Sequence, residues 1–144
     1  MGQHVLVPVD GSDQAEAAFE YALEKLTDPK ITLLHVVEPA SSHTYGDGEH
    51  FDVEGYQRAI QRQREEGEEM LNEYRERAAA AGIEVETQIT DGQPAKQILG
   101  AIDEHAIDQV VMGSRGRSGV GRILFGSVAE TVTRRSAVPV TIVR

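Results

Sequence analysis

The sequence predicts an α/β fold in three layers, an open parallel sheet of five strands with helices on both faces. Five short apolar runs of strand length alternate with four segments of helical length, the pattern of strands joined by right-handed helical crossovers. The chain has 144 residues, 40% of them hydrophobic and 26% charged. This length suits one core, so we expect residues 1–144 to form a single domain.

The first half of the chain contains the first two predicted strands. His4 to Val9 (HVLVPV) is apolar and β-branched, which favours a buried strand. Ser12 then caps a predicted helix that ends at Asp28-Pro29. Ile31 to Val37 (ITLLHVV) is a continuous apolar run, typical of a parallel strand covered on both faces, and His35 within it is expected to be a hydrogen-bonded core histidine.

A polar stretch and a charged helix follow. Glu38 to Asp52 has no period and is predicted to be a long loop, whereas Val53 to Ala81 is predicted to be a largely solvated helix in which Gly67 marks a bend. A divalent metal could be bound by side chains of the loop, but a solvated loop is the favoured interpretation. The candidate ligands are His43, Asp47, Glu49, His50 and Asp52.

The second half alternates strand and helix again. Predicted strands are Ile83 to Ile89, near an edge of the sheet, Gln109 to Met112, and Val138 to Val143; predicted helices are Pro94 to His105 and Ser127 to Ser136. Ligands of open parallel sheets bind beyond the carboxyl ends of the strands, where the strand order reverses. The turns Asp10–Ser12 and Gly113–Gly116 follow strands one and four, so these two turns are expected to flank one crevice.

The charge is acidic overall and positive near the C-terminus. The formal net charge of −10 argues against nucleic acid and against an anionic membrane as partners. From Arg115 to the end there are six arginines and one acidic residue. This segment therefore carries +5 against −15 for the residues before it, which predicts an anionic ligand here.

Composition also bears on the environment of the protein. Only three of the 14 basic residues are lysines, a bias typical of proteins from a high-salt cytoplasm; an ordinary acidic protein is the alternative, and stability that is unchanged in molar salt would favour it. There is no cysteine, no apolar run near the roughly 18 residues of a membrane span, and no basic stretch before the first apolar segment. We expect a cytoplasmic protein.

A glycine-rich segment carries the chemistry. Gly113 to Ser127 contains five glycines and three arginines and leads from a strand into a helix. Glycines allow backbone amides to converge on phosphate oxygens, and the helix start adds amides and a positive dipole end. The segment contains neither a P-loop nor a Rossmann fingerprint. A flexible surface loop is the alternative interpretation.

The segment Gly113-x2-Gly116-x9-Gly126-Ser127 resembles the nucleotide motif of the universal stress protein family, in its ATP-binding branch. VLVPVDGS at the start, LLHVV in the second strand and VPVTIVR at the end resemble the same family. The resemblance implies the strand order 3-2-1-4-5, an adenine nucleotide across strands one and four, and a homodimer through the last strand, Val138 to Val143.

The resemblance also implies which residues contact the nucleotide. On the adenosine side these are Pro8, Val9, Asp10, Val36, Met112 and Gly113; toward the phosphates they are Gly116, Gly126, Ser127 and Val128. Asp10 would accept hydrogen bonds from ribose hydroxyls, and Val36 would read the adenine edge through its backbone. Arg115 and Arg117 are added as phosphate contacts on charge alone. The alternatives are a helix-capping role for Asp10 and core packing for Met112.

These residues predict a nucleotide-dependent regulatory protein that binds ATP or another adenine nucleotide, with or without Mg²⁺. No catalytic triad can be assembled, and the glycine-rich segment lacks a carboxylate or histidine that could act as general base, so efficient hydrolysis is not expected. A slow ATPase or nucleotide hydrolase is the alternative of a different class. A dimeric stress protein that binds another anion is a third.

Overall fold

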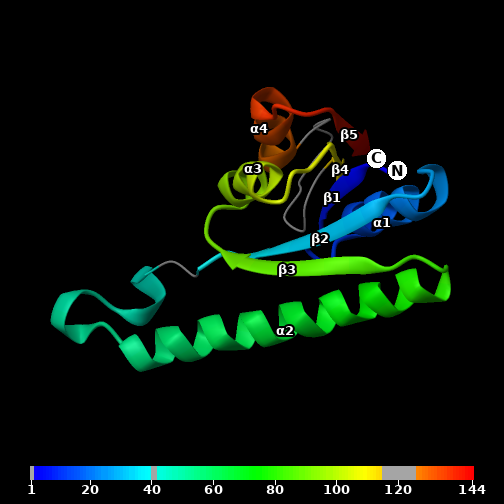
Figure 1. Ribbon diagram of the computed structural model, residues 1–144. Helices are drawn as coiled ribbons and strands as arrows, with labels where there is room; N and C mark the ends of the chain where they lie inside the picture. Colours follow the sequence, from blue (N-terminus) through cyan, green and yellow to red (C-terminus); the bar gives the residue numbers. More distant parts are fainter. Residues whose placement is uncertain (1, 40–41, 115–125) are drawn as a thin grey trace.

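The structure is a computed structural model that describes residues 2–39, 42–114 and 126–144 (Figure 1). It is a five-stranded parallel sheet in the order β3-β2-β1-β4-β5, so the predicted fold class is confirmed. The strands are β1 (His4–Pro8), β2 (Lys30–Val37), β3 (Val85–Asp91), β4 (Gln109–Gly113) and β5 (Val140–Val143). The helices are α1 (Asp13–Lys25), α2 (Val53–Ala80), α3 (Pro94–Glu104) and α4 (Ser127–Arg135), with short 3-10 turns η1 (Ser42–Tyr45) and η2 (Gly48–His50).

The two faces of the sheet bury two separate cores. Successive side chains of a strand point to opposite faces, so Val5 and Val7 of β1 pack with Phe19 of α1 and Leu71 of α2. Leu6, between those two valines, belongs to the other core, which α3 and α4 cover. Both faces of β1 and β2 are thus apolar, as the continuous runs in the sequence indicate.

Local chemistry sets the helix ends. The Ser12 hydroxyl accepts a hydrogen bond from Ala15 N–H (3.1 Å) and caps α1, as predicted. The Asp52 carboxylate caps α2 in the same way by accepting from Gly55 N–H (2.9 Å). α2 ends where Gly82 takes a positive φ of 78°, which a glycine adopts without strain.

The strands β3 and β5 and the loop after β2 differ most from the sequence prediction, while the other strands differ by one residue at one end. β3 begins at Val85 rather than Ile83, because Ile83 N–H donates to Ala78 O (2.9 Å) and closes the end of α2. β5 begins at Val140, two residues later than predicted. The segment after β2 is not wholly irregular, since it contains η1 and η2.

Helix α2 extends beyond the edge of the sheet. Its 28 residues span about 42 Å, whereas the seven residues of β3 span about 23 Å. Figure 1 shows the first turns of α2 and the η1–η2 segment projecting past the end of β3. Arg64 of α2 forms an ion pair with Asp91, the last residue of β3 (2.5 Å). None of the residues before Arg64 in this helix is buried.

The helix runs through Gly67 without interruption, and Gly67 is buried. A Cβ atom at this position would lie 2.6 Å from His35 Cδ2 and 3.0 Å from Ile89 Cδ1. The glycine therefore allows a close approach of helix and sheet. Within the described part of the chain, every helix is too short or too polar to cross a bilayer.

Candidate functional site

The pairing of strands β1 and β4 stops before their carboxyl ends. Their pairing comprises Val5↔Gln109 and Leu6↔Val110, and among the described residues it goes no further, although β1 continues to Pro8 and β4 to Gly113. On its other side β4 stays paired with β5 up to Gly113↔Val143. The strand order reverses between these two strands, so their unpaired carboxyl ends border the position at which such sheets usually have an opening for a ligand.

A tight turn borders this opening on the β1 side. The Asp10 carboxylate accepts a hydrogen bond from Ser12 N–H (3.0 Å), and Gly11 takes a positive φ of 80°. Ser12, not Asp10, provides the side-chain cap of α1. The alternative in which Asp10 caps the helix is therefore wrong. The Asp10 carboxylate accepts from Ser12 N–H and so shapes the turn that precedes the helix.

The backbone of Val36 faces the same opening. Leu34 O accepts a hydrogen bond from Val9 N–H (2.9 Å) on the β1 side, and Val37 O accepts one from Gly92 N–H (3.0 Å) on the β3 side. Backbone groups of alternate residues point to opposite neighbouring strands, so Val36 directs its N–H and C=O toward β1. Because β1 ends at Pro8, these groups lie beyond the end of that strand.

The end of β4 is packed more closely than the sequence suggests. A Cβ atom on Gly113 would lie 2.7 Å from the backbone carbon of Gln14, in the first turn of α1. Glycine is required here by protein packing alone. Met112 is 6% exposed and belongs to the core under α3 and α4, which agrees with its core-packing alternative.

The start of α4 lies next to the end of β4. Gly126 N–H donates to Ser114 O (2.5 Å), and Ser114 N–H donates to Val143 O (3.0 Å). Gly126 occupies the N-cap of α4 and, having no side chain, leaves the first amides of the helix without a side-chain cap. Ser127 is exposed and Val128 partly buried. Uncapped amides at a helix start form a ready anion site.

The predicted site residues fall into two groups. Pro8, Val9, Asp10, Val36, Met112, Gly113, Gly126, Ser127 and Val128 are described, and all of them lie at the carboxyl ends of β1, β2 and β4 or at the adjoining start of α4. Arg115, Gly116 and Arg117 lie outside the described residues. Sequence reasoning missed Gln14, because no pattern indicates which residue faces Gly113.

His35 also borders the site. Its Nδ1 lies 2.9 Å from Val9 O, and a carbonyl can only accept a hydrogen bond, so Nδ1 carries the proton and donates it. The prediction of a hydrogen-bonded core histidine is confirmed, although the side chain is half-buried rather than fully buried. Its contact with a predicted site residue was not foreseen.

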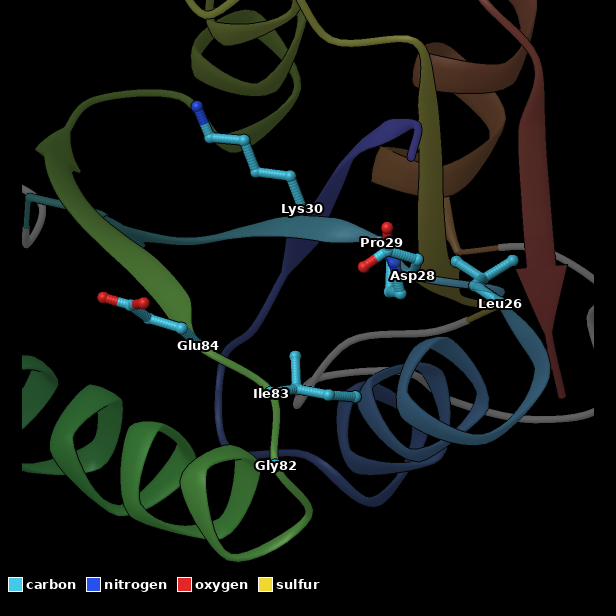
Figure 2. A pocket seen from close by; sticks show the side chains of 7 residues that line it. All are labelled: Leu26, Asp28, Pro29, Lys30, Gly82, Ile83 and Glu84. Atoms are coloured by element: carbon cyan, nitrogen blue, oxygen red, sulfur yellow. The ribbon is translucent and has the colours of Figure 1, made fainter. Parts of the chain in front are cut away.

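A second hollow, of about 370 Å³, lies at the opposite end of the sheet (Figure 2). The α1–β2 turn lines it with Leu26, Asp28 and Pro29, the α2–β3 turn with Gly82, Ile83 and Glu84, and β2 with Lys30. It lies at the amino ends of β2 and β3, away from Asp10 and Gly113. Among the described residues, no group of three or more histidine or acidic side chains could hold a metal ion.

The topology defines a doubly wound α/β protein whose strand order reverses between β1 and β4. The model of the universal stress protein family matches residues 1–144. The chain is 34% identical over 148 residues to the universal stress protein YxiE of Bacillus subtilis (strain 168), and the match covers 100% of both chains. A putative universal stress protein of Staphylococcus aureus (strain USA300) is 35% identical over 147 residues, covering 99% of this chain and 84% of that one. The chain belongs to the universal stress protein family.

Solved structures agree with this assignment. The hypothetical protein MJ0577 superposes with a TM-score of 0.83 at 26% identity, covering 99% of this chain and 96% of that one. A universal stress protein solved in complex with cAMP has a TM-score of 0.64 at 28% identity, covering 99% and 97%. An Arabidopsis thaliana family member solved with AMP bound shares the fold at a TM-score of 0.69 and 22% identity, covering 98% and 90%. Relatives of this chain thus bind adenine nucleotides.

Proposed function

We propose that this chain is a cytoplasmic regulatory protein of the stress response that binds ATP or another adenine nucleotide, with or without Mg²⁺, between β1 and β4. The observation that carries the proposal is the opening where β1 and β4 stop pairing after Leu6↔Val110. It lies where open α/β sheets bind ligands. The relatives solved with cAMP and AMP support an adenine nucleotide as the ligand.

Three features of the site match the parts of a nucleotide. The backbone N–H and C=O of Val36, directed beyond the end of β1, provide one donor and one acceptor for the edge of an adenine base. The carboxylate of Asp10 provides acceptors for ribose hydroxyls. The uncapped amides at Ser127 and Val128 favour phosphate oxygens, because the positive end of the α4 dipole lies there.

The test is calorimetric titration of the chain with ATP. Asp10→Ala should weaken ATP binding by about tenfold to a hundredfold, the effect of losing hydrogen bonds to a charged acceptor. Asp103→Ala is the matched control. Asp103 is an exposed aspartate of α3 and is not one of the predicted site residues. Absence of ATP, ADP and AMP binding by the unaltered chain, or equal affinity of Asp10→Ala and the unaltered chain, would overturn the proposal.

Hydrolysis is measured in the same samples. Phosphate release above the protein-free rate that is lost in Asp10→Ala would establish the slow ATPase in place of a pure binding role. No release over many hours, with ATP binding retained, would support regulation by occupancy.

The proposal includes a homodimer through the last strand. β5 is an edge strand, and Val110 N–H and Ser114 N–H donate to Pro139 O and Val143 O on its inner side. By alternation, the N–H and C=O groups of Val140 and Ile142 point outward. An edge that carries free backbone groups and partly exposed apolar residues favours pairing with a second copy.

A further inference from the structure

The backbone carbonyl of Val9 accepts a hydrogen bond from a side chain, at a place where a parallel sheet would provide a backbone N–H of the neighbouring strand. Val9 N–H donates to Leu34 O (2.9 Å), as in a continuing parallel pair. The next bond of such a pair would run from Val36 N–H to Val9 O. That bond is missing from the backbone hydrogen bonds of the described chain. His35 Nδ1 donates to Val9 O instead (2.9 Å).

This exchange of partners has two effects on the site. The carbonyl of Val9 belongs to the peptide unit that leads into Asp10, so the imidazole fixes the orientation of that unit without requiring β1 to pair further with β2. Val36 N–H makes no hydrogen bond to Val9 O, so it is not used in the ladder with β1. The same donor that a continuous sheet would use up stays available beyond the end of β1.

The position of the imidazole depends on α2. Gly67 is buried in that helix, and its missing side chain leaves the space for the ring: a Cβ atom there would lie 2.6 Å from His35 Cδ2 and 3.1 Å from His35 Nε2. Ile89 of β3 closes the same space, 3.0 Å from that Cβ position. The ring is therefore held between β2, β3 and α2 with its Nδ1 toward Val9.

We propose that His35 is a positioning residue of the nucleotide site: its Nδ1–H replaces a sheet hydrogen bond at Val9 O, orients the Val9–Asp10 peptide unit and leaves Val36 N–H free for the adenine base. This inference rests on the proposed function and assigns to the site a residue that does not touch the nucleotide. Its influence is confined to the adenosine half, since Val9, Asp10 and Val36 lie at β1 and β2 while the phosphate half lies at α4.

Two variants of the full-length chain separate the hydrogen bond from the packing. His35→Asn places an amide N–H near the position of Nδ1, because both nitrogens are bonded to Cγ, whereas His35→Leu fills much of the volume without a donor. Their affinities for ATP and for inorganic tripolyphosphate, which has no adenosine, are measured by calorimetry. We expect His35→Leu to weaken ATP binding by about tenfold, the usual effect of one lost hydrogen bond with an unsatisfied buried partner.

The expected pattern has two further parts. His35→Asn should bind ATP within about threefold of the unaltered chain, and tripolyphosphate binding should be the same in all three proteins. Equal ATP affinity of His35→Leu and His35→Asn would overturn the inference, as would a parallel loss of ATP and tripolyphosphate binding, which indicates general disruption. Circular dichroism confirms that each variant is folded. A chain that binds no adenine nucleotide before substitution refutes the proposed function itself.

Discussion

Two buried hydroxyl groups have no hydrogen-bond partner among the described residues: those of Thr90 in β3 and Tyr74 in α2. A buried polar group without a partner loses its hydrogen bonds to water on folding, at a cost of about 1 to 3 kcal/mol. Both therefore reduce the free energy of unfolding. Each can be tested by removing the oxygen alone.

Replacement of Thr90 by valine exchanges the hydroxyl for a methyl group of similar size. Thr90→Val should stabilise the chain by about 1 kcal/mol and raise Tm by about 2 to 4 °C. The matched control is Thr32→Val in the neighbouring strand, because the buried Thr32 hydroxyl lies 2.7 Å from His4 Nε2. The control should lower Tm, since it takes from His4 Nε2 its partner Thr32. Thermal unfolding followed by circular dichroism measures both, and the same direction of change in the two variants would contradict the expectation.

The phenol of Tyr74 makes stability depend on alkaline pH. Burial, together with the negative charges of Glu16, Asp10 and Glu20 and against the opposing charge of Arg77, raises the pKa of Tyr74 from 10.0 to about 12. Between these values the unfolded chain releases the proton and the folded chain keeps it, so stability falls as pH rises through this window. The contribution is fully present below pH 10.

Tyr74→Phe tests this dependence. It keeps the edge-to-face contact with Phe19, whose ring centroid lies 4.8 Å away, and removes the titrating group. Denaturant unfolding between pH 9 and 12 should show a smaller loss of stability in Tyr74→Phe than in the unaltered chain. Identical pH profiles would show that the phenol has the same pKa in both states.

Single residues also show where sequence reasoning stops. The turn at Asp10–Ser12 could be predicted because turn chemistry favours certain residue types, whereas phosphate binding by the glycines of the C-terminal motif stays a prediction from their spacing. The partnership of His35 with Val9 and the contact of Gly113 with Gln14 could not be identified, because both depend on where one strand ends relative to another element. Chain alternation predicts which face a side chain occupies, but not which atom it meets there.

Among the elements, α2 and α3 offer a matched pair of buried and open glycines. A Cβ atom at Gly67 of α2 would lie 2.6 Å from His35 Cδ2, whereas one at Gly100 of α3 meets nothing within 4 Å. Gly100→Ala should stabilise the chain by about 1 kcal/mol, because alanine favours the helix. Gly67→Ala should be neutral or destabilising, since overpacking costs about 1 to 3 kcal/mol.

Chemical denaturation of the two alanine variants decides between these effects. Equal stabilisation by both substitutions would mean that the ring of His35 moves aside freely, and would remove the packing reason for a glycine at position 67. A loss confined to Gly67→Ala supports the close approach of helix and sheet.

The elements themselves could largely be predicted, because apolar runs and helical periodicity reflect burial. β1, β2 and the four helices lie where these patterns place them, and Ser12 caps α1 as predicted. The start of β3 could not be predicted in the same way, because Ile83 continues the alternating pattern and yet closes α2 through Ala78. Periodicity cannot distinguish these two uses of one apolar residue.

For the whole molecule, the open edge at β5 predicts a dimer. Light scattering should give about twice the 15.7 kDa of one chain. Ile142→Pro should yield a monomer, because proline removes an outward N–H without breaking a hydrogen bond to β4. A particle of one chain mass for the unaltered protein, or a dimer that persists in Ile142→Pro with the fold retained, would contradict the proposed interface.

The order of the strands could be predicted from the family resemblance, whereas the crevice stays a prediction from the rule that ligands bind where that order reverses. The site itself could be predicted only as a set of residues at strand ends. Its shape depends on how far β1 and β4 remain paired. The extent of this pairing is a property of the backbone register, which the residue types do not indicate.

The two parts of α2, before and after Arg64, differ in how strongly the rest of the fold constrains the length of the helix. From Arg64 onward the helix packs along β3, and Leu71 and Tyr74 point into the core. An inserted or deleted residue there would rotate these two side chains away from the core. Before Arg64 no residue of the helix is buried, and the ring contacts of Tyr56 in this part are with Tyr45 and Phe51 of the adjoining η1–η2 segment rather than with the sheet. Removal of seven residues there, close to two full turns, would shorten the projection and leave the orientation of the buried half almost unchanged. The sheet and its two cores therefore set no length for this part of the helix, whose packing partner is the η1–η2 segment.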